Sequence, residues 1–290
     1  MSVPVWLALG RVSNLPTIWT NALAGTALAG GEPWHRSTLL VATALSLLYV
    51  GGMYLNDAFD AAVDARERPG RPIPSGRVAA ETVFAAGFAL LLAGLALLAP
   101  AVALRPEGAG LLAVVAGIGL AGAIVFYDWN HKGNPLSPLF MGLCRVLAYL
   151  TAGLVAAARP QAGLWVLAAV GLAWLVGLTY AAKQEAFDRL ERVWPLFFLA
   201  APLLYGLLRL DAGPLAWAVL LILALWLGYA LFLLRRRAKG DVPRAVAGLI
   251  AGIALVDALF LAAAGAAGAA LAALGCFALT LLLQRRIAGT

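Results

Sequence analysis

The stretch from Leu39 to Asp64 reads L-L-V-A-T-A-L-S-L-L-Y-V-G-G-M-Y-L-N-D-A-F-D-A-A-V-D, and it places a long apolar run directly before a series of oxygen-bearing side chains. The run carries no charged residue from residue 38 to residue 56. A helix needs about 20 consecutive apolar residues to cross the hydrocarbon core of a bilayer. The first part of the stretch therefore predicts a transmembrane helix, and the second part predicts a polar site at its end.

The composition extends this prediction to the whole chain of 290 residues. Hydrophobic residues make up 63% and charged residues 12%, whereas a soluble domain is about half apolar and about a quarter charged. We therefore predict an all-α, polytopic bundle of nine or ten transmembrane helices, which forms a single domain over residues 1–290 and leaves no length for a soluble catalytic domain. The predicted spans lie at about 15–31, 38–56, 79–100, 109–127, 136–157, 163–182, 194–208, 214–234, 243–264 and 266–283.

Basic residues gather in alternate predicted loops. The net charge of +7 and the pI near 9.8 first report orientation in a membrane chain, so they do not indicate a nucleic-acid partner. One set of loops holds most Lys and Arg residues, and the other set holds only Arg36, Arg105, Arg159 and Arg209. This asymmetry predicts an integral, multi-pass protein of the cell inner membrane, with both termini and two polar loops, about 56–78 and 183–193, in the cytoplasm. No obligatory protein partner is indicated.

Three oxygen-bearing residues of the first polar loop, Asn56, Asp60 and Asp64, are spaced four residues apart. On a continuous helix this spacing keeps them within a sector of about 80°, where they form one oxygen-rich stripe. Mg²⁺ prefers oxygen ligands and is commonly held by one or two carboxylates together with substrate phosphates. A single acid at a helix end usually only caps the helix or pairs with a neighbouring cation. Three in register favour a Mg²⁺ site.

Basic residues follow this stripe. Arg68, Arg71 and Arg77 lie in a loop rich in Pro and Gly, and guanidinium groups bind phosphate oxygens with charge-assisted hydrogen bonds. Arg68 and Arg71 are therefore candidate ligands for a diphosphate. Asp57, which lies in the same loop, is a further candidate residue of the substrate-binding site.

The second polar loop repeats the residue types of the first. Residues 184–188 read Q-E-A-F-D and residues 56–60 read N-D-A-F-D. Because four predicted spans separate the loops, both lie on the same side of the membrane. We expect Asp188 to join the stripe as a ligand, and Lys183 and Gln184 to contact the substrate.

A few polar residues fall within predicted spans. Arg145 lies near the middle of its span, where a charge must face a cavity or a partner, so it either binds substrate or pairs with Asp257. Asn14 and Asn21 either orient an acceptor or form interhelical hydrogen bonds. Small residues, such as those at Ala24-Gly25 and Gly51-Gly52, predict close helix packing.

Together these residues resemble the UbiA superfamily of intramembrane prenyltransferases over essentially the whole chain. The resemblance rests on N-D-x-x-D-x-x-x-D at 56–64, R-P-I-P-S-G-R at 71–77 and R-V-S-N-L-P-T-I-W-T-N at 11–21, with support from Tyr127, Lys132 and Tyr180. The stretches R-V-S-N-L-P and Y-A-A-K-Q-E are also similar to an EboC-like branch. The second motif departs from the common D-x-x-x-D, because Gln184 replaces the first Asp and is a poorer Mg²⁺ ligand.

The resemblance implies a helical bundle around a lipid-accessible cavity. The implied reaction moves a polyprenyl group from its diphosphate to a small acceptor, namely an aromatic compound, a quinone precursor or a polyol, with Mg²⁺ between the two motifs. The implied catalytic and metal-binding residues are Asn56, Asp60, Asp64 and Asp188. The substrate-binding candidates are Arg68, Arg71, Lys132, Lys183, Gln184, Asp57, Arg145 and Asn14.

Two other classes of function stay open at this point. One is a small transporter or permease, although transport sites favour the middle of the membrane and these acids gather at one face. The other is a homologue that binds prenyl lipids with weakened catalysis, which the Gln184 departure permits.

Overall fold

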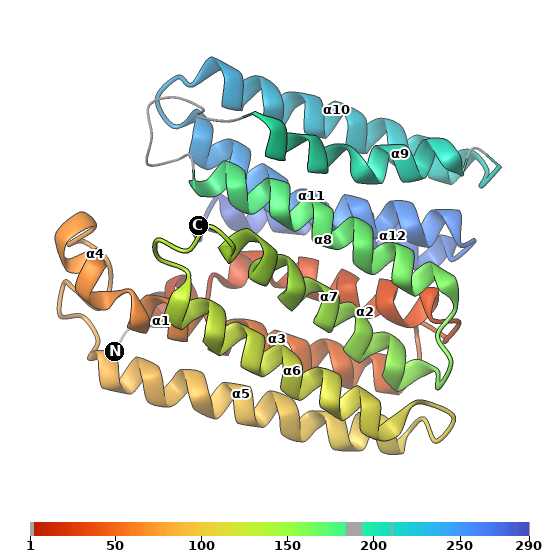
Figure 1. Cartoon of the computed structure of the whole chain (residues 1–290), viewed down its shortest axis with the longest axis horizontal. Helices are drawn as coiled ribbons and strands as arrows, with labels where there is room; N and C mark the ends of the chain where they lie inside the picture. Colours follow the sequence, from red (N-terminus) through yellow and green to blue (C-terminus); the bar gives the residue numbers. More distant parts are fainter. Residues whose placement is uncertain (1–2, 184–192, 210, 290) are drawn as a thin grey trace.

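The computed structural model describes residues 3–183, 193–209 and 211–289, which form helices and connecting loops with no strand among them. Figure 1 shows the long helices lying side by side along the longest axis. The elements are α1 (Val3–Leu9), η1 (Val12–Asn14), α2 (Leu15–Leu28), α3 (Arg36–Phe59), α4 (Ala61–Glu67), α5 (Ala80–Ala103), α6 (Gly110–Asn130), α7 (Ser137–Ala156), α8 (Ala162–Lys183), η3 (Trp194–Ala200), α9 (Ala201–Leu208), α10 (Pro214–Arg236), α11 (Asp241–Ala263) and α12 (Ala267–Gln284).

Each predicted span coincides with a helical segment, so the all-helical membrane fold is confirmed. Among the described residues, 8 helices are long and apolar enough to cross a membrane: α3, α5, α6, α7, α8, α10, α11 and α12. Two predicted spans are shorter. Helix α2 has 14 residues, and the segment Trp194–Leu208 falls below the same length.

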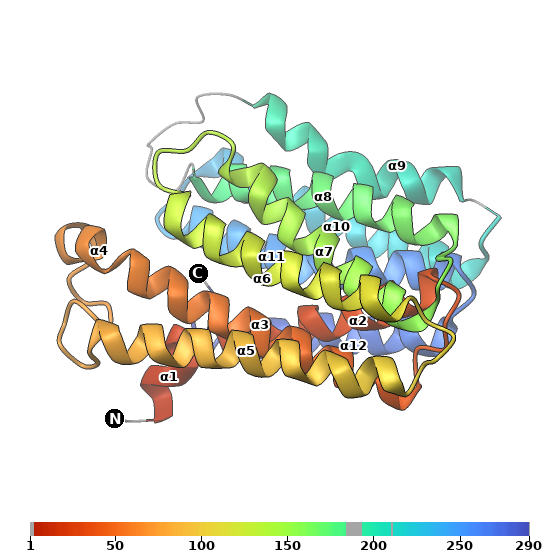
Figure 2. The ribbon, with the colours of Figure 1, turned by 60° about the horizontal axis from the view of Figure 1, so that its bottom comes forward.

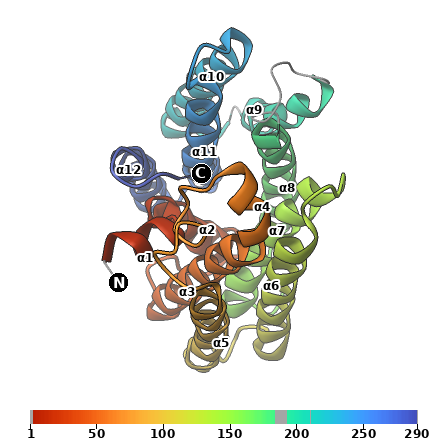
Figure 3. The ribbon, with the colours of Figure 1, turned by 90° about the vertical axis from the view of Figure 1, so that its left-hand side faces the viewer.

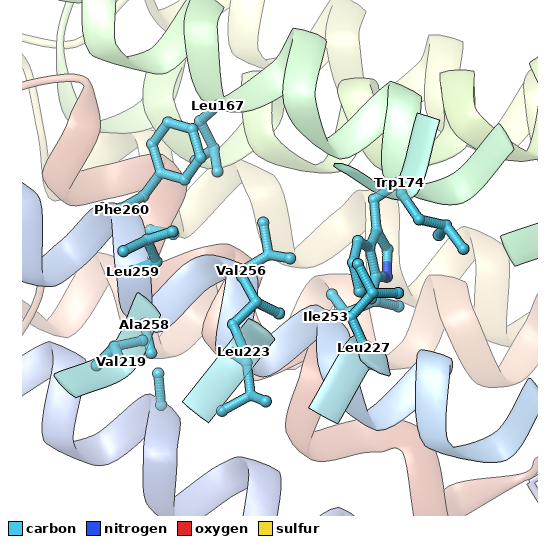
Figure 4. Packing of buried hydrophobic residues seen from close by; sticks show 14 of the residues in the cluster. Leu167, Trp174, Val219, Leu223, Leu227, Ile253, Val256, Ala258, Leu259 and Phe260 are labelled. Carbon is cyan, nitrogen blue, oxygen red and sulfur yellow. The ribbon is translucent and has the colours of Figure 1, made fainter. Parts of the chain in front are cut away.

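Helix α11 occupies the centre of one half of the bundle. In its most apolar window 89% of the residues are buried inside the protein, so most of this helix contacts other helices and not lipid. Figure 4 shows Ile253, Val256 and Phe260 of α11 packed among side chains of α8 and α10, such as Trp174 and Leu223. This apolar packing holds α11 beside α2 and α8. Asp257 of α11 then lies within hydrogen-bond distance of side chains of α2 and α7.

Glycines allow the close helix packing that the small residues predict. A Cβ atom on Gly25 of α2 would lie 2.7 Å from the Tyr149 carbonyl oxygen of α7, and one on Gly51 of α3 would lie 2.8 Å from the Gly87 carbonyl oxygen of α5. Both contacts involve backbone atoms, which cannot move aside as a flexible side chain can. The α2–α7 and α3–α5 pairs therefore depend on the missing side chains.

The predicted stripe does not lie on one continuous helix. Helix α3 ends at Phe59 and α4 begins at Ala61, and Asp60 joins them with φ −78° and ψ −6°. The amide of Val63 donates to the Asp60 carbonyl oxygen at 2.9 Å, which is the tighter hydrogen-bond pattern of a 3₁₀ turn. This turn bends the chain, and α4 lies across the end of the bundle, the same end at which α1 and the end of α12 lie (Figures 2 and 3).

Candidate active site

A polar cavity of about 300 Å³ lies at the end of the bundle that carries α4. Despite the bend at Asp60, the three residues of the predicted stripe all line it. The cavity also receives side chains from η1, α6, α7, α8 and α11, so segments far apart in the sequence meet there. Its polar lining residues are Arg11, Asn14, Thr17, Tyr49, Asn56, Asp60, Asp64, Arg68, Arg71, Tyr127, His131, Lys132, Arg145 and Thr179.

An apolar cavity of about 100 Å³ lies beside the polar one, between α2, α3, α6 and α7. Tyr49, Met53, Tyr127 and Arg145 line both spaces. Tyr49 lies seven residues before Asn56 on α3, which places it about 10 Å deeper along the helix axis. The site therefore combines a charged opening with an apolar interior.

We call the charged opening the motif rim; it comprises Asn56, Asp57, Asp60, Asp64, Arg68, Arg71, His131 and Lys132. Within it, Arg71 bridges two acids, because its Nη1 atom lies 3.2 Å from Asp57 Oδ1 and 2.9 Å from Asp64 Oδ2. Asp57 also pairs with Arg11 at 3.0 Å. Asp57 does not line the cavity, and these contacts give it the role of holding two arginines in place.

Asp60 carries a second set of cationic contacts. Its Oδ2 atom lies 3.2 Å from Lys132 Nζ and 3.4 Å from His131 Nε2. The ring of His131 stacks on Tyr127 with the ring centres 5.0 Å apart. Partial burial by itself would raise the pKa of Asp60, but the hydrogen bond from His131 and the charges of His131 and Lys132 together lower the pKa below its ordinary value. Asp60 is therefore ionised at neutral pH.

Asn56 is oriented by its contacts on both sides. Its Nδ2 atom donates to Asp128 Oδ1 at 3.1 Å, and its Oδ1 atom accepts from Arg11 Nη2 at 3.3 Å. Asp128 is buried, and its Oδ2 atom has no hydrogen-bond partner among the described residues. These contacts hold the Asn56 side chain in a defined orientation at the cavity wall.

The other sequence candidates divide into three groups. Arg68, Lys132, Asn14 and Arg145 line the polar cavity as predicted. Lys183 does not line it; its Nζ atom donates to the Asn134 carbonyl oxygen at 2.8 Å. Gln184 and Asp188, together with most of the second motif, lie outside the described residues.

The polar residues of the spans form interhelical contacts. Asn14 donates to Tyr49 Oη at 3.2 Å and to the Gly289 carbonyl oxygen at 2.8 Å. Arg145 forms no ion pair with Asp257 or with any other carboxylate of the described residues, so of the two alternatives for Arg145 the direct pair with Asp257 is not formed. The guanidinium of Arg145 instead donates to the Asn21 side-chain oxygen, because Asn21 stands between the two charges.

Sequence reasoning missed the roles of Arg11 and His131. Arg11 has a positive φ of 42°, a conformation that costs a non-glycine residue about 1 kcal/mol, and it reaches across to Asn56 and Asp57. Its only sequence signal is its place at the start of R-V-S-N-L-P. His131 could have been suspected because it directly precedes Lys132.

The donor set at the motif rim fits a Mg²⁺ ion that is shared with a substrate. The side chains of Asn56, Asp60 and Asp64 line one cavity with five Lys and Arg side chains, namely Arg11, Arg68, Arg71, Lys132 and Arg145. Among the described residues no group of three His, Cys, Asp or Glu side chains could hold a metal by itself. Mg²⁺ usually takes only one or two protein carboxylates and completes its shell with water and phosphate oxygens. The rim therefore suits a Mg²⁺–diphosphate and not a closed metal cage.

Curated relatives match large parts of this chain. A digeranylgeranylglyceryl phosphate synthase of Methanopyrus kandleri is 29% identical over 210 residues, which cover 69% of each chain. Proteins of the same name from Methanoregula boonei and Sulfolobus acidocaldarius are 38% and 33% identical, over 33% and 40% of this chain and 34% and 42% of their own lengths. The chain is thus similar to the first relative over about two thirds of its length and to the others over shorter segments.

Solved structures share the fold. An apo structure of a UbiA homologue from Aeropyrum pernix K1 superposes with a TM-score of 0.63 at 18% identity and covers 87% of this chain and 96% of that one. A structure from work on digeranylgeranylglyceryl phosphate synthase in membranes gives 0.61 at 19% identity, with 90% and 97% covered. The sequence profile of the UbiA prenyltransferase family matches residues 15–252. The chain therefore belongs to the UbiA prenyltransferase family, as its motifs predicted.

Proposed function

We propose that this chain, a prenyltransferase of the UbiA family, carries out a Mg²⁺-dependent transfer of a polyprenyl group from its diphosphate to a small acceptor within the membrane. One observation carries the proposal. The oxygen-bearing residues Asn56, Asp60 and Asp64 share a cavity with Arg68, Arg71 and Lys132, and this cavity lies beside an apolar space inside a helical bundle. A substrate with an anionic head and an apolar tail matches both parts.

The motif rim would bind the diphosphate. Departure of a diphosphate places negative charge on its oxygens, and cations that are already positioned there stabilise this charge in the transition state. When bound, Mg²⁺ would supply further positive charge to the same oxygens. Asn56, Asp60 and Asp64 would hold the ion, with Asp188 as an additional ligand, while Arg68 and Lys132 would contact the diphosphate directly.

Asp57 would position neighbouring side chains at the motif rim. Arg71 and Arg11 are held by Asp57, so Asp57 would position the guanidinium groups and not contact the substrate itself. The apolar interior would receive the prenyl chain and exclude water, which would otherwise react with the allylic cation. Gln184 would contact the substrate from the second polar loop, whereas Lys183 donates to the Asn134 carbonyl oxygen and does not line the cavity.

The names of the relatives favour one class of acceptor. Digeranylgeranylglyceryl phosphate contains two geranylgeranyl groups on a glyceryl phosphate, so a glyceryl phosphate that carries one such group is the first acceptor to test. The basic loops place the motif rim and both termini on the cytoplasmic side of a cell inner membrane in this proposal.

The proposal is tested with purified protein in nanodiscs, geranylgeranyl diphosphate and a panel of geranylgeranylglyceryl phosphate, 4-hydroxybenzoate and glycerol. We expect release of diphosphate and a prenylated product with at least one acceptor, and loss of both on addition of EDTA. Asp60→Ala would abolish the reaction, while Glu81→Ala, an exposed acid at the start of α5, would not change it.

Three results would contradict the proposal. Full activity of Asp60→Ala would show that the motif rim takes no part in the reaction. Substrate binding without product for every acceptor would favour the prenyl-lipid-binding alternative, and Mg²⁺-independent uptake of a solute into proteoliposomes would favour the transporter alternative.

A further inference from the structure

We infer that Arg145 binds an oxyanion of the acceptor, a phosphate or a carboxylate, and that Asp257 positions Arg145 through Asn21. The inference rests on the proposed function in treating the second ligand of the cavity as an acceptor. The residues involved are called the deep polar cluster: Thr20 and Asn21 of α2, Arg145 and Tyr149 of α7, and Asp257 of α11.

Arg145 lies well inside the bundle. It follows the first residue of α7 by eight positions, or about 12 Å of helix, and it lines both the polar and the apolar cavity. No carboxylate of the described residues pairs with it. A guanidinium inside a membrane protein is costly unless a partner or a cavity compensates its charge, so the open side of Arg145 attracts an anion.

The diphosphate already has its own cations. Arg68, Arg71 and Lys132 line the cavity at the motif rim. Arg145 lines the polar cavity and also, together with Tyr49 and Tyr127, the apolar space, which Arg68, Arg71 and Lys132 do not line. A ligand bound at Arg145 would therefore sit deeper than the diphosphate and beside the prenyl chain, which is the place of the acceptor.

Asp257 fixes the direction of the Arg145 contact. Its carboxylate accepts hydrogen bonds from Thr20 Oγ1 at 2.5 Å, Asn21 Nδ2 at 2.7 Å and Tyr149 Oη at 2.6 Å. Because a carboxylate accepts and does not donate, the amide nitrogen of Asn21 must face Asp257, and the amide oxygen must face the other way. The guanidinium of Arg145 donates to that oxygen. Asp257 thus determines which end of the Asn21 amide faces Arg145.

The interaction is tested by titrating ligands into wild-type protein in nanodiscs without any prenyl diphosphate, using isothermal titration calorimetry. The ligands are geranylgeranylglyceryl phosphate, 4-hydroxybenzoate and the uncharged geranylgeranylglycerol. Arg145→Gln should weaken binding of the phosphate or the carboxylate ligand by about 10-fold or more, since hydrogen bonds between charged groups are among the stronger ones. In the same variant, the affinity for geranylgeranylglycerol should change less than about 2-fold. The affinity for geranylgeranyl diphosphate, measured in a separate titration with Mg²⁺, should also change less than about 2-fold. The phosphate and carboxylate arms tell which oxyanion the site takes.

Asp257→Asn tests the positioning role. We expect it to reduce the preference for the charged over the uncharged ligand by about 3-fold or more, because the Asn21 amide is then free to reverse and present its nitrogen to Arg145. Asp241→Asn is the matched control, since Asp241 is a buried acid of the same helix that pairs with Arg236 away from the cavity. It should lower thermal stability without changing the ligand preference.

Three outcomes would overturn the inference: binding of the charged ligands by Arg145→Gln as tightly as by wild type, an equal loss for the uncharged ligand, or a loss confined to geranylgeranyl diphosphate. Because the titrations require no turnover, they separate this inference from the proposed function. A protein that binds the phosphate ligand through Arg145 but transfers nothing would refute the reaction and support the site.

Discussion

The motif rim and the deep polar cluster both contain buried carboxylates, but the neighbours of these carboxylates differ. Asp57, Asp60 and Asp64 at the rim contact the charged side chains Arg11, Arg71 and Lys132. Asp257 in the deep cluster contacts only neutral donors among the described residues.

This difference separates two uses of an acid in a membrane protein. A carboxylate paired with cationic side chains at an opening can exchange a cation for a metal ion, since solvent screens part of the change. A carboxylate that accepts from neutral donors on two other helices cannot leave them without exposing unsatisfied groups to an apolar interior. The rim is thus suited to binding a metal ion and a reacting substrate, and the deep polar cluster is suited to positioning the Arg145 side chain.

The largest effect that would test this comparison is on stability. Asp257→Ala should lower the free energy of unfolding by about 3–5 kcal/mol, because it removes three hydrogen bonds to one buried carboxylate and leaves the Tyr149 hydroxyl without its acceptor. Thermal unfolding in detergent would measure it. Asp211→Ala is the control, since Asp211 is 81% exposed and its ion pair with Arg209 spans 3.6 Å; its effect should stay below about 0.5 kcal/mol. Equal effects of the two substitutions would contradict the alignment role.

Asp64→Ala should show the opposite pattern. We expect prenyl transfer to fall by about 100-fold or more, because Asp64 would hold the Mg²⁺ ion that stabilises the charge on the departing diphosphate. The unfolding temperature should change little, since Arg71 keeps its contact with Asp57. Initial rates of diphosphate release and thermal unfolding of the same preparation would test both parts. A large loss of stability with normal turnover per folded molecule would show that the rim acids are structural.

Gly25→Ala tests whether the deep cluster depends on close packing. The added methyl group would meet the Tyr149 backbone and push α2 away from α7, one turn from Asn21. We expect a loss of about 1–3 kcal/mol, measured by thermal unfolding. Gly122→Ala is the control, because nothing lies within 4 Å of its would-be Cβ atom. A neutral result for Gly25→Ala would show that the two helices can separate without cost.

The smallest expected effect concerns Lys132, whose side chain is 47% exposed. Lys132→Met should raise the KM for the polyprenyl diphosphate by about 3- to 10-fold and leave the unfolding temperature unchanged, because it removes one of several cations around the cavity. Steady-state kinetics would measure the change, with the exposed Lys239→Met as control. An unchanged KM would show that Lys132 does not contact the diphosphate.

The sequence predicts the membrane spans well, because hydropathy is a local property and each span needs only its own residues. It also predicts that Asn56, Asp60 and Asp64 share one cavity. The helix break at Asp60 escapes prediction, since the residues around it, such as Ala58, Ala61 and Ala62, favour a continuous helix.

The contacts between distant residues could not be predicted from spacing. The ion pair of Arg11 with Asp57 connects residues far apart in the sequence. Asn21 bonds to both Arg145 and Asp257 only after α2 has packed between α7 and α11. The sequence indicates that a mid-membrane arginine needs a partner, and it offers Asp257 as the charge of opposite sign. It contains no signal that an asparagine stands between them.

The Arg71 bridge between Asp57 and Asp64 offsets negative charge at the opening of the cavity without any bound ion. Carboxylates gathered at one opening would repel one another during insertion, and the bridge neutralises them with a residue of the same chain. We therefore expect the newly inserted protein to reach its final shape before it encounters a metal ion. If Mg²⁺ binds there as proposed, its binding would be a late exchange of partners at a folded surface, and scarcity of the ion would limit turnover without limiting the amount of folded protein.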